Sequence, residues 1–225
     1  MLNPAGKPVM SNDLITYLWI DNCSDSLMKI TKFFVLIVIM MGTISGWGQN
    51  KVQETEFRRL CSEVANAFAK NSIADVNKYI DPSAGVYVIT RPGALDVITH
   101  ESKLDEKKPF AVNYKDASSV KKHKVSYGAL PKYSCGDIKW DKLAFVADST
   151  TKPKRLSDIM YFRSTNEGEK YTAAQIEAKD AVERKMRKVV YPTIAKKRGL
   201  VFYMSFLNGK WYLTVIDTAE GKCAA

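Results

Sequence analysis

The sequence lacks most of the patterns by which metal and nucleophile chemistry is recognised in a chain. It has only two His and four Cys in 225 residues, and no Cys-x-x-Cys, so neither a thioredoxin-like motif nor a zinc ribbon is supported. No second His lies four residues from His100 or His123, so the zincin motif fails. No Gly-x-Ser-x-Gly occurs, and the one Gly-x-Gly, at residues 46–48, opens no phosphate-binding loop. We therefore expect no metal and no cofactor.

The composition excludes several further classes of protein. An apolar share of 46%, with 12 Gly and 8 Pro, excludes a disordered or collagen-like chain. A single long apolar run excludes a polytopic membrane protein. Lys and Arg number 34 against 24 Asp and Glu, a net charge of +10. Such a charge favours acidic partners.

An export signal is predicted over residues 28–48. Met28 and two lysines precede the apolar run 33–41, and small residues follow, which is the order of a secretory signal. Gly46 and Gly48 take the −3 and −1 positions if cleavage precedes Gln49. The apolar stretch is shorter than the roughly 20 residues of a spanning helix. We expect an exported protein, periplasmic or secreted in a Gram-negative bacterium, with an uncleaved signal anchor as the alternative.

The residues before the signal have two interpretations. Residues 1–27 either reflect a start assigned too far upstream, with Met28 the true start, or form an unstructured cytoplasmic tail. Residues 49–225 contain no internal repeat and no linker. We expect them to form a single α+β domain that contacts a membrane only transiently, through the signal peptide.

The cysteines predict one disulfide in that domain. Cys23 precedes the signal, and Cys61 lies on the apolar stripe of an expected helix, where a buried thiol is usual. Cys135 lies in a loop and Cys223 in the C-terminal tail. An oxidising compartment would join Cys135 to Cys223 and tie down the tail.

Apolar periodicity and capping residues predict the helices. They cover residues 52–70, 73–80, 101–107, 153–159 and 172–190. Ser72 is the expected N-cap of the second. In the last, Asp180/Arg184 and Glu183/Arg187 are predicted i, i+4 pairs on its solvated side.

The strongest strand prediction is a C-terminal hairpin. Further strands are expected at residues 85–91, 110–114, 124–127 and 143–146. Asn208-Gly209 is the turn of a hairpin between residues 200–207 and 210–217. Its register predicts the pairs Phe206/Trp211, Met204/Leu213 and Phe202/Val215 on the core face. Asp217 would then end the inward face of the hairpin.

Both ends of the domain resemble a known superfamily. The stretch 57–91, in which residues 76–81 lead into 85–88, and the ending 209–217 resemble the nuclear-transport-factor-2-like superfamily, in particular its secreted Gram-negative members of unknown function. The resemblance implies a cone, in which a curved antiparallel sheet wraps around the N-terminal helices and leaves a pocket at its open end. The predicted helical insertion at 153–190 departs from the minimal pattern.

Two kinds of site are compatible with such a cone. Enzymes of the superfamily often place an acid/base pair in it, for which His100 and Asp217 are the weak candidates; the alternative is a surface His and an Asp that closes a strand. Asp81 and Arg91 flank the first strand and, with Tyr87 and Tyr212, could line a mouth that binds a small anion. The alternative is a surface ion pair.

The positive charge is concentrated in four runs. They cover residues 121–124, 152–155, 184–188 and 196–198. Export removes nucleic acid from the expected partners and leaves anionic envelope glycans or lipopolysaccharide. An ordinary solvated surface is the alternative.

The predicted function is therefore an exported, non-catalytic module that binds a small ligand or serves an accessory role. One alternative is a small isomerase, dehydratase or hydrolase that uses His100 and Asp217. A second is binding of anionic surfaces through the basic runs.

Overall fold

A computed structural model describes residues 51–107, 124–148, 153–168, 171–192, 199–221 and 223. The chain divides into two compact units, residues 1–54 and 55–225, and the fold below is that of the second. Several predictions lie outside the described residues: the tail 1–27, the signal 28–48, the strand 110–114, and residues 121–123, 152 and 196–198 of the basic runs.

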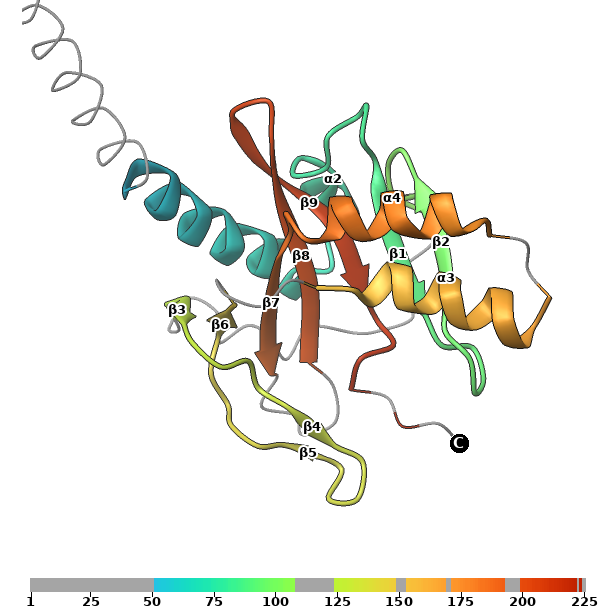
Figure 1. Ribbon diagram of the computed structural model, residues 1–225. Coiled ribbons are helices and arrows are strands. Elements are labelled where there is room, and N and C mark those ends of the chain that lie inside the picture. The colour runs from blue at the N-terminus through green and yellow to red at the C-terminus, as the bar shows by residue number, and fades with distance from the viewer. Residues whose placement is uncertain are drawn as a thin grey trace, which may run out of the picture. The chain divides into compact units, whose positions relative to one another are not determined.

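A seven-stranded sheet forms the centre of the domain, in the order β2-β1-β9-β8-β7-β6-β3 (Figure 1). Its strands are β1 (Val86–Thr90), β2 (Val97–Glu101), β3 (Ser126–Tyr127), β6 (Val146–Ala147), β7 (Arg187–Pro192), β8 (Gly199–Leu207) and β9 (Lys210–Asp217). The α+β class is confirmed. The wholly antiparallel sheet is wrong, because β9 inserts beside β1 in parallel and β3 runs parallel to β6.

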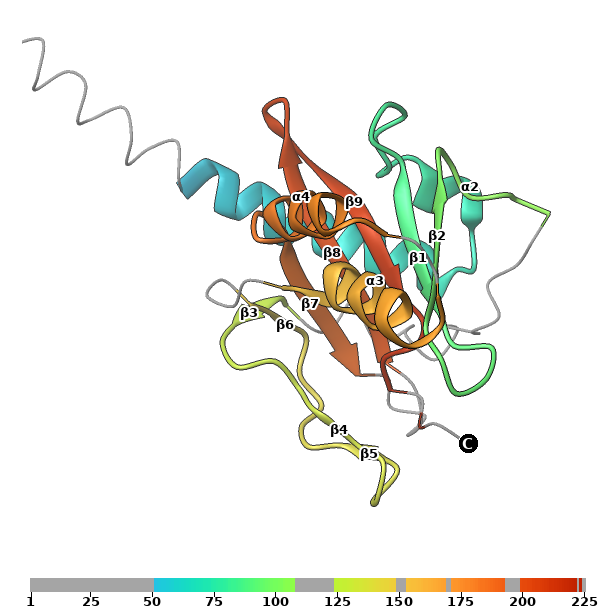
Figure 2. The ribbon, with the colours of Figure 1, turned by 45° about the vertical axis from the view of Figure 1, so that its right-hand side comes forward.

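Helices cover both faces of this sheet. One face is covered by α2 (Ile73–Asn77) and by the part of the N-terminal helix (residues 51–69) that belongs to this unit, where the predicted stripe from Phe57 to Phe68 is buried. Ser72 caps α2 as predicted. On the other face, α3 (Arg155–Asn166) and α4 (Ala173–Glu183) lie side by side (Figures 1 and 2). The sheet therefore separates two apolar clusters, the first with the N-terminal helix and α2 and the second with α3.

The predicted long helix over 172–190 is wrong in its second half. The chain leaves α4 after Glu183 and enters β7, in which Val189 faces the first cluster and Val190 the second. A strand buried on both faces has no polar alternation, so its sequence is easily taken for the end of a helix. The helix predicted at 101–107 is also wrong, because β2 reaches Glu101 and turns follow.

The C-terminal hairpin contains one irregularity that the turn did not predict. Phe206 faces Trp211 and Met204 faces Leu213, as expected, but a β-bulge then shifts the pairing. Tyr203 faces Val215, so the predicted Phe202/Val215 pair is wrong. One extra residue reverses which face each later side chain occupies. Asp217 consequently lies on the α3 face and not on the predicted inward face.

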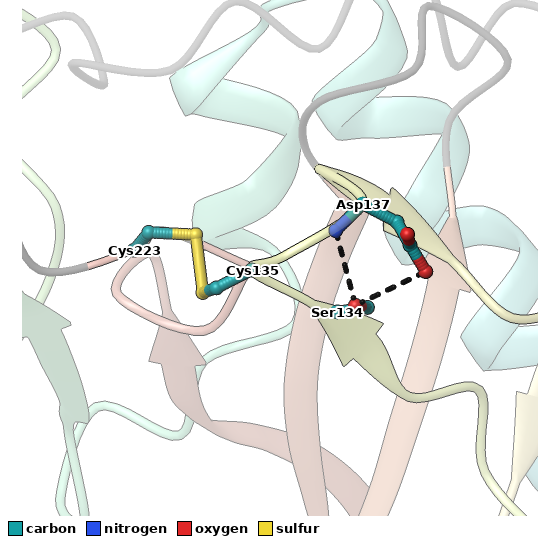
Figure 3. Close-up of a disulfide and its surroundings, with 4 residues drawn as sticks. All are labelled: Ser134, Cys135, Asp137 and Cys223. Atoms are coloured by element: carbon teal, nitrogen blue, oxygen red, sulfur yellow. Dashed lines mark hydrogen bonds between the residues drawn. A yellow bond between two sulfur atoms is a disulfide. The ribbon is translucent and has the colours of Figure 1, made fainter.

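A smaller hairpin stands apart from this sheet and carries half of the disulfide. Strands β4 (Tyr133–Ser134) and β5 (Lys139–Trp140) come between β3 and β6 in the chain and form a separate two-stranded sheet. Cys135, in its loop, is bonded to Cys223, with the two Cα atoms 5.6 Å apart (Figure 3). The predicted bridge is confirmed, and Cys61 is a buried cysteine outside any disulfide, as expected.

The bridge joins residues 88 positions apart, so it should contribute measurably to stability. We expect Cys135→Ser/Cys223→Ser to lower the free energy of unfolding by about 2–4 kcal/mol, because the unfolded chain regains the entropy that the crosslink removes. Urea unfolding followed by circular dichroism measures this. A reductant should destabilise the parent chain and leave the double variant unchanged; equal stability of the parent in both conditions would contradict the prediction.

Candidate functional site

A cavity of about 1040 Å³ opens on the α3 face of the sheet. Three segments that are distant in sequence supply most of its wall: residues 128–133 with Cys135, residues 153–155 at the start of α3, and residues 219–221 after β9. Tyr203 and Lys188, which are neighbours across β8 and β7, line it from the sheet. The cavity is therefore a product of tertiary folding.

The cavity wall carries more positive than negative charge. Its ionisable cations are Arg91, Lys132, Lys154, Arg155 and Lys188, and its carboxylates are Asp148, Asp158 and Glu220. Lys188 already pairs with Glu220 at 2.6 Å. Lys132 and Lys154 are exposed and, within the part of the chain that the structure describes, make no ion pair. Their charges are therefore available to a bound anion.

A buried ionic network forms one edge of the cavity. Arg155 on α3 donates from Nε to Asp217 Oδ2 at 2.9 Å and from Nη2 to Asp96 Oδ2 at 2.6 Å. Asp96, between β1 and β2, also accepts a hydrogen bond at Oδ1 from Nε of Arg91, at 2.6 Å. The side chain of Asp217 is 0% exposed. The network thus joins α3, the end of β9 and the β1–β2 turn.

The ion pairs of this network favour the ionised forms of Asp96 and Arg155. Burial alone would raise the pKa of Asp96, but the guanidinium groups of Arg91 and Arg155 outweigh it and hold that pKa below its usual range. Burial opposes the charge of Arg155 as well, yet the attraction of Asp217 and Asp96 raises its pKa. Both carboxylates are committed to arginines, which makes them poor candidates for proton transfer.

The second oxygen of Asp217 holds the chain that follows it. Oδ1 accepts hydrogen bonds from the backbone N–H groups of Ala219 and Glu220, both at 2.9 Å. Thr218 is tied to β1 through its N–H and hydroxyl, which both donate to the carbonyl of Ile89. One wall of the cavity is thereby fixed by the sheet.

The predicted acid/base pair is not brought together. His100 is exposed on the edge strand β2, where its Nε2 lies 2.9 Å from the carbonyl oxygen of Ala84. Asp217 is buried two strands away and is bonded to Arg155. Each group already has its own partner, so neither is positioned to act on the other.

The predicted anion-binding set is divided between different places. Arg91 lines the cavity, but Asp81 precedes β1 and accepts hydrogen bonds from Ser83 and from the backbone N–H of Ala84. The Ser83 hydroxyl and these N–H groups hold the pKa of Asp81 below its usual value. Asp81 therefore shapes the turn before β1, and the structure does not bring it to Arg91.

Tyr87 and Tyr212 have separate surroundings. The ring of Tyr87 stacks on His100 with centroids 4.4 Å apart, and Lys179 lies 4.0 Å above the ring and donates to its hydroxyl. Tyr212 is half-buried opposite Ser205, towards the turn of the C-terminal hairpin. Neither tyrosine lines the cavity.

Glu183 has a different role from the predicted one. Its carboxylate is buried and accepts the backbone N–H groups of Leu156, at 2.6 Å, and Ser157, at 2.8 Å. The N–H groups of the first turn of a helix have no acceptor within the helix, and the N-cap of α3, Lys154, supplies no side-chain acceptor. Glu183 supplies the acceptor for two of them. The predicted Glu183/Arg187 pair is wrong, because Arg187 stacks on Phe57 and Trp211. The Asp180/Arg184 pair is confirmed.

The described parts of the basic runs are largely occupied. Arg184 pairs with Asp180, Arg187 covers aromatic rings, and Lys188 pairs with Glu220. In the run 152–155, Arg155 belongs to the network. The exposed residues among these parts of the runs are Lys124, Lys154, Arg184 and Lys185.

Sequence reasoning missed the residues that organise the site. In the sequence, Arg155 is one of several cations in the basic run 152–155, and Asp96 lies in a stretch with no clear period. An arginine at the start of a helix and an aspartate that ends an apolar strand are the signals that could have suggested a buried pair. The β-bulge, which the sequence did not predict, turns Asp217 towards Arg155.

Comparison with protein-family models, with curated proteins and with solved structures returns no match for this chain. Within the described residues, no group of His, Cys, Asp and Glu side chains is arranged to hold a metal ion. No helix in that part of the chain has the length and apolarity needed to span a bilayer.

The carboxylate of Glu183 should be important for the position of α3. We expect Glu183→Ala to lower the free energy of unfolding by about 2–3 kcal/mol, because two buried N–H groups lose their acceptor. Glu177→Ala, on the exposed side of the same helix, is the matched control and should change stability by less than about 0.5 kcal/mol. Equal losses in both variants would contradict the capping role.

The same residue predicts a pH dependence. Burial raises the pKa of Glu183 above its ordinary value of 4.5, although the N–H groups of Leu156 and Ser157 oppose the shift. The folded chain then holds this proton more tightly than the unfolded chain, so its contribution is complete below pH 4.5 and is lost as pH rises through the folded pKa. The free energy of unfolding, measured from below pH 4.5 upwards, should include this decrease in the parent chain and lack it in Glu183→Gln.

Removal of Arg155 should be far more damaging than removal of a surface arginine. Arg155→Met leaves the buried carboxylate of Asp217 without its cation and should cost about 3–5 kcal/mol. The control is Arg59→Met, which breaks an exposed i, i+4 pair with Glu63 and should cost less than about 0.5 kcal/mol. Chemical denaturation of both variants decides; comparable losses would show that the network contributes no more than a surface pair.

Proposed function

We propose that this chain is an exported, non-catalytic binding module that takes a small anionic ligand in the cavity on the α3 face. The observation that carries the proposal is a pair of exposed lysines in the cavity wall. Lys132 and Lys154 come from different segments of that wall and make no ion pair within the described residues. Arg155 uses only Nε and Nη2 in the network.

The size and the remaining lining suit a small molecule. Ligand pockets usually measure about 300–1,000 Å³ and combine apolar walls with a few polar groups. A volume of about 1040 Å³ is slightly above that range, and Leu130, Pro131 and Ala219 supply apolar wall. An anion with a flat or aliphatic body would use both the charge and the apolar surface.

A binding role is supported over a catalytic one by the state of the acidic groups. Asp96 and Asp217 are consumed by arginines, and Glu220 by Lys188. His100 does not line the cavity. These three carboxylates are thus held by cations and are poorly placed to move a proton on a ligand.

Export and superfamily membership are part of the proposal. The lysine-led apolar segment at 28–48 and the disulfide both favour an oxidising compartment. Packing of the N-terminal helix and α2 on one face of the sheet supports the resemblance to the nuclear-transport-factor-2-like cone. The proposed ligand site lies on the opposite face, outside the mouth that the resemblance implies.

The proposal is tested with naphthalene sulfonate, an anion with a flat apolar body, by isothermal titration calorimetry. We expect binding that weakens with salt, and much weaker binding of neutral naphthalene methanol. Lys154→Gln should weaken binding about tenfold, because a charge-assisted contact is lost. Lys210→Gln, exposed at the far end of β9, removes the same charge and should leave affinity unchanged.

Two results would refute this function. The disulfide-bonded chain could fail to bind the sulfonate, or it could bind the neutral compound equally well. Equal effects of Lys154→Gln and Lys210→Gln would indicate a diffuse response to net charge and would place binding outside the cavity.

A further inference from the structure

The segment 128–142, here called the flap, forms one wall of the cavity and is folded largely on itself. Lys132 and Asp141 exchange hydrogen bonds at its base, both at 2.9 Å. Ser134 and Asp137 close its tip, next to Cys135 (Figure 3). Among the described residues, the hydrogen bonds of the flap join flap residues to one another.

Within the described residues, the flap is attached to the rest of the domain by a covalent bond and by packing. The Cys135–Cys223 disulfide holds its tip. At its base, Trp140, Leu130 and Tyr133 lie against the apolar cluster on the α3 face of the sheet, and the ring of Trp140 is so close to Gly199 that a Cβ atom there would come within 2.6 Å of it. Because residues 135–139 are exposed, the tip depends on the disulfide and the base on packing.

The opposite wall does not depend on the disulfide. Residues 219 and 220 are held by the carboxylate of Asp217, and Glu220 is held by Lys188. These contacts do not involve the disulfide. Loss of the disulfide should therefore free the flap and leave the wall after β9 in place.

The disulfide is open to chemical attack. Both Cys135 and Cys223 are exposed residues, so the bridge lies at the surface of the domain and not in its core. Exposed disulfides are the class that exchanges readily with thiols, whereas buried structural bridges resist.

We propose that Cys135–Cys223 is a thiol-exchange latch that controls ligand binding in the cavity. The disulfide-bonded chain holds the flap over the cavity and binds the anion, and the reduced chain releases the flap and loses affinity. This inference rests on the proposed function for the ligand, and adds its regulation.

The reaction requires a dithiol reductant. One thiolate attacks a sulfur of the bridge, the S–S bond breaks and a mixed disulfide forms; the second thiol then displaces the protein sulfur. Two electrons pass from the dithiol to the protein, two protons accompany them, and the products are two cysteine thiols and the disulfide of the reductant. Reoxidation is the reverse exchange, in which a disulfide compound accepts the two electrons and leaves as a dithiol.

The test measures naphthalene sulfonate affinity with and without dithiothreitol. We expect reduction to raise the Kd at least tenfold in the parent chain. Cys135→Ser/Cys223→Ser should show the weak Kd in both conditions, which controls for effects of the reductant. The reciprocal effect is a second measurement: saturating sulfonate should make the bridge harder to reduce by the same factor.

Hydrogen exchange distinguishes flap release from unfolding. On reduction, amides of residues 128–142 should lose protection while those of β7, β8 and β9 keep it. Loss of protection across the sheet, or an unchanged Kd with an unchanged flap, would overturn the latch. If the disulfide-bonded chain binds no sulfonate, the proposed function fails. Release of the flap on reduction would then be a conformational change that regulates no binding of the anion.

Discussion

The ion pair between Arg155 and Asp217 is the contact on which the described architecture depends. A fully buried carboxylate is costly unless a cation and hydrogen bonds compensate it. Here Arg155 compensates one oxygen, and the backbone N–H groups of residues 219 and 220 compensate the other. One side chain thereby positions the start of α3, the end of β9 and one wall of the cavity.

This pair exists because of a single extra residue in the hairpin. In a regular ladder, Asp217 would face the N-terminal helix and its apolar cluster, where the structure has Phe202 and Ile216. The bulge turns it towards α3 instead. Glu183 adds a second, independent tie, because it caps the first turn of the same helix. The helix is thus held at its N-terminus by two buried acids.

The cavity unites a rigid wall and a separately folded one. Residues after β9 are stabilised by the central sheet, whereas the flap has its own small sheet and is attached by the disulfide at its tip and by packing of Trp140, Leu130 and Tyr133 at its base. Regions with few ties to the core open at lower free energy than the core itself. Because the cavity lies between the flap and the wall after β9, ligand binding in it depends on the contacts that hold the flap.

Local chemistry by itself determined the elements whose signals are short in range: the Asn208-Gly209 hairpin, the apolar stripe of the N-terminal helix, the Ser72 cap, and the two cysteines placed in loops. The tertiary structure decided the rest. Strand β7 has no alternation because both its faces are buried, and Glu183 and Arg155 read as surface charges until distant segments enclose them. Periodicity reports one face of one element, and the cavity is made by three segments that only the folded sheet brings together.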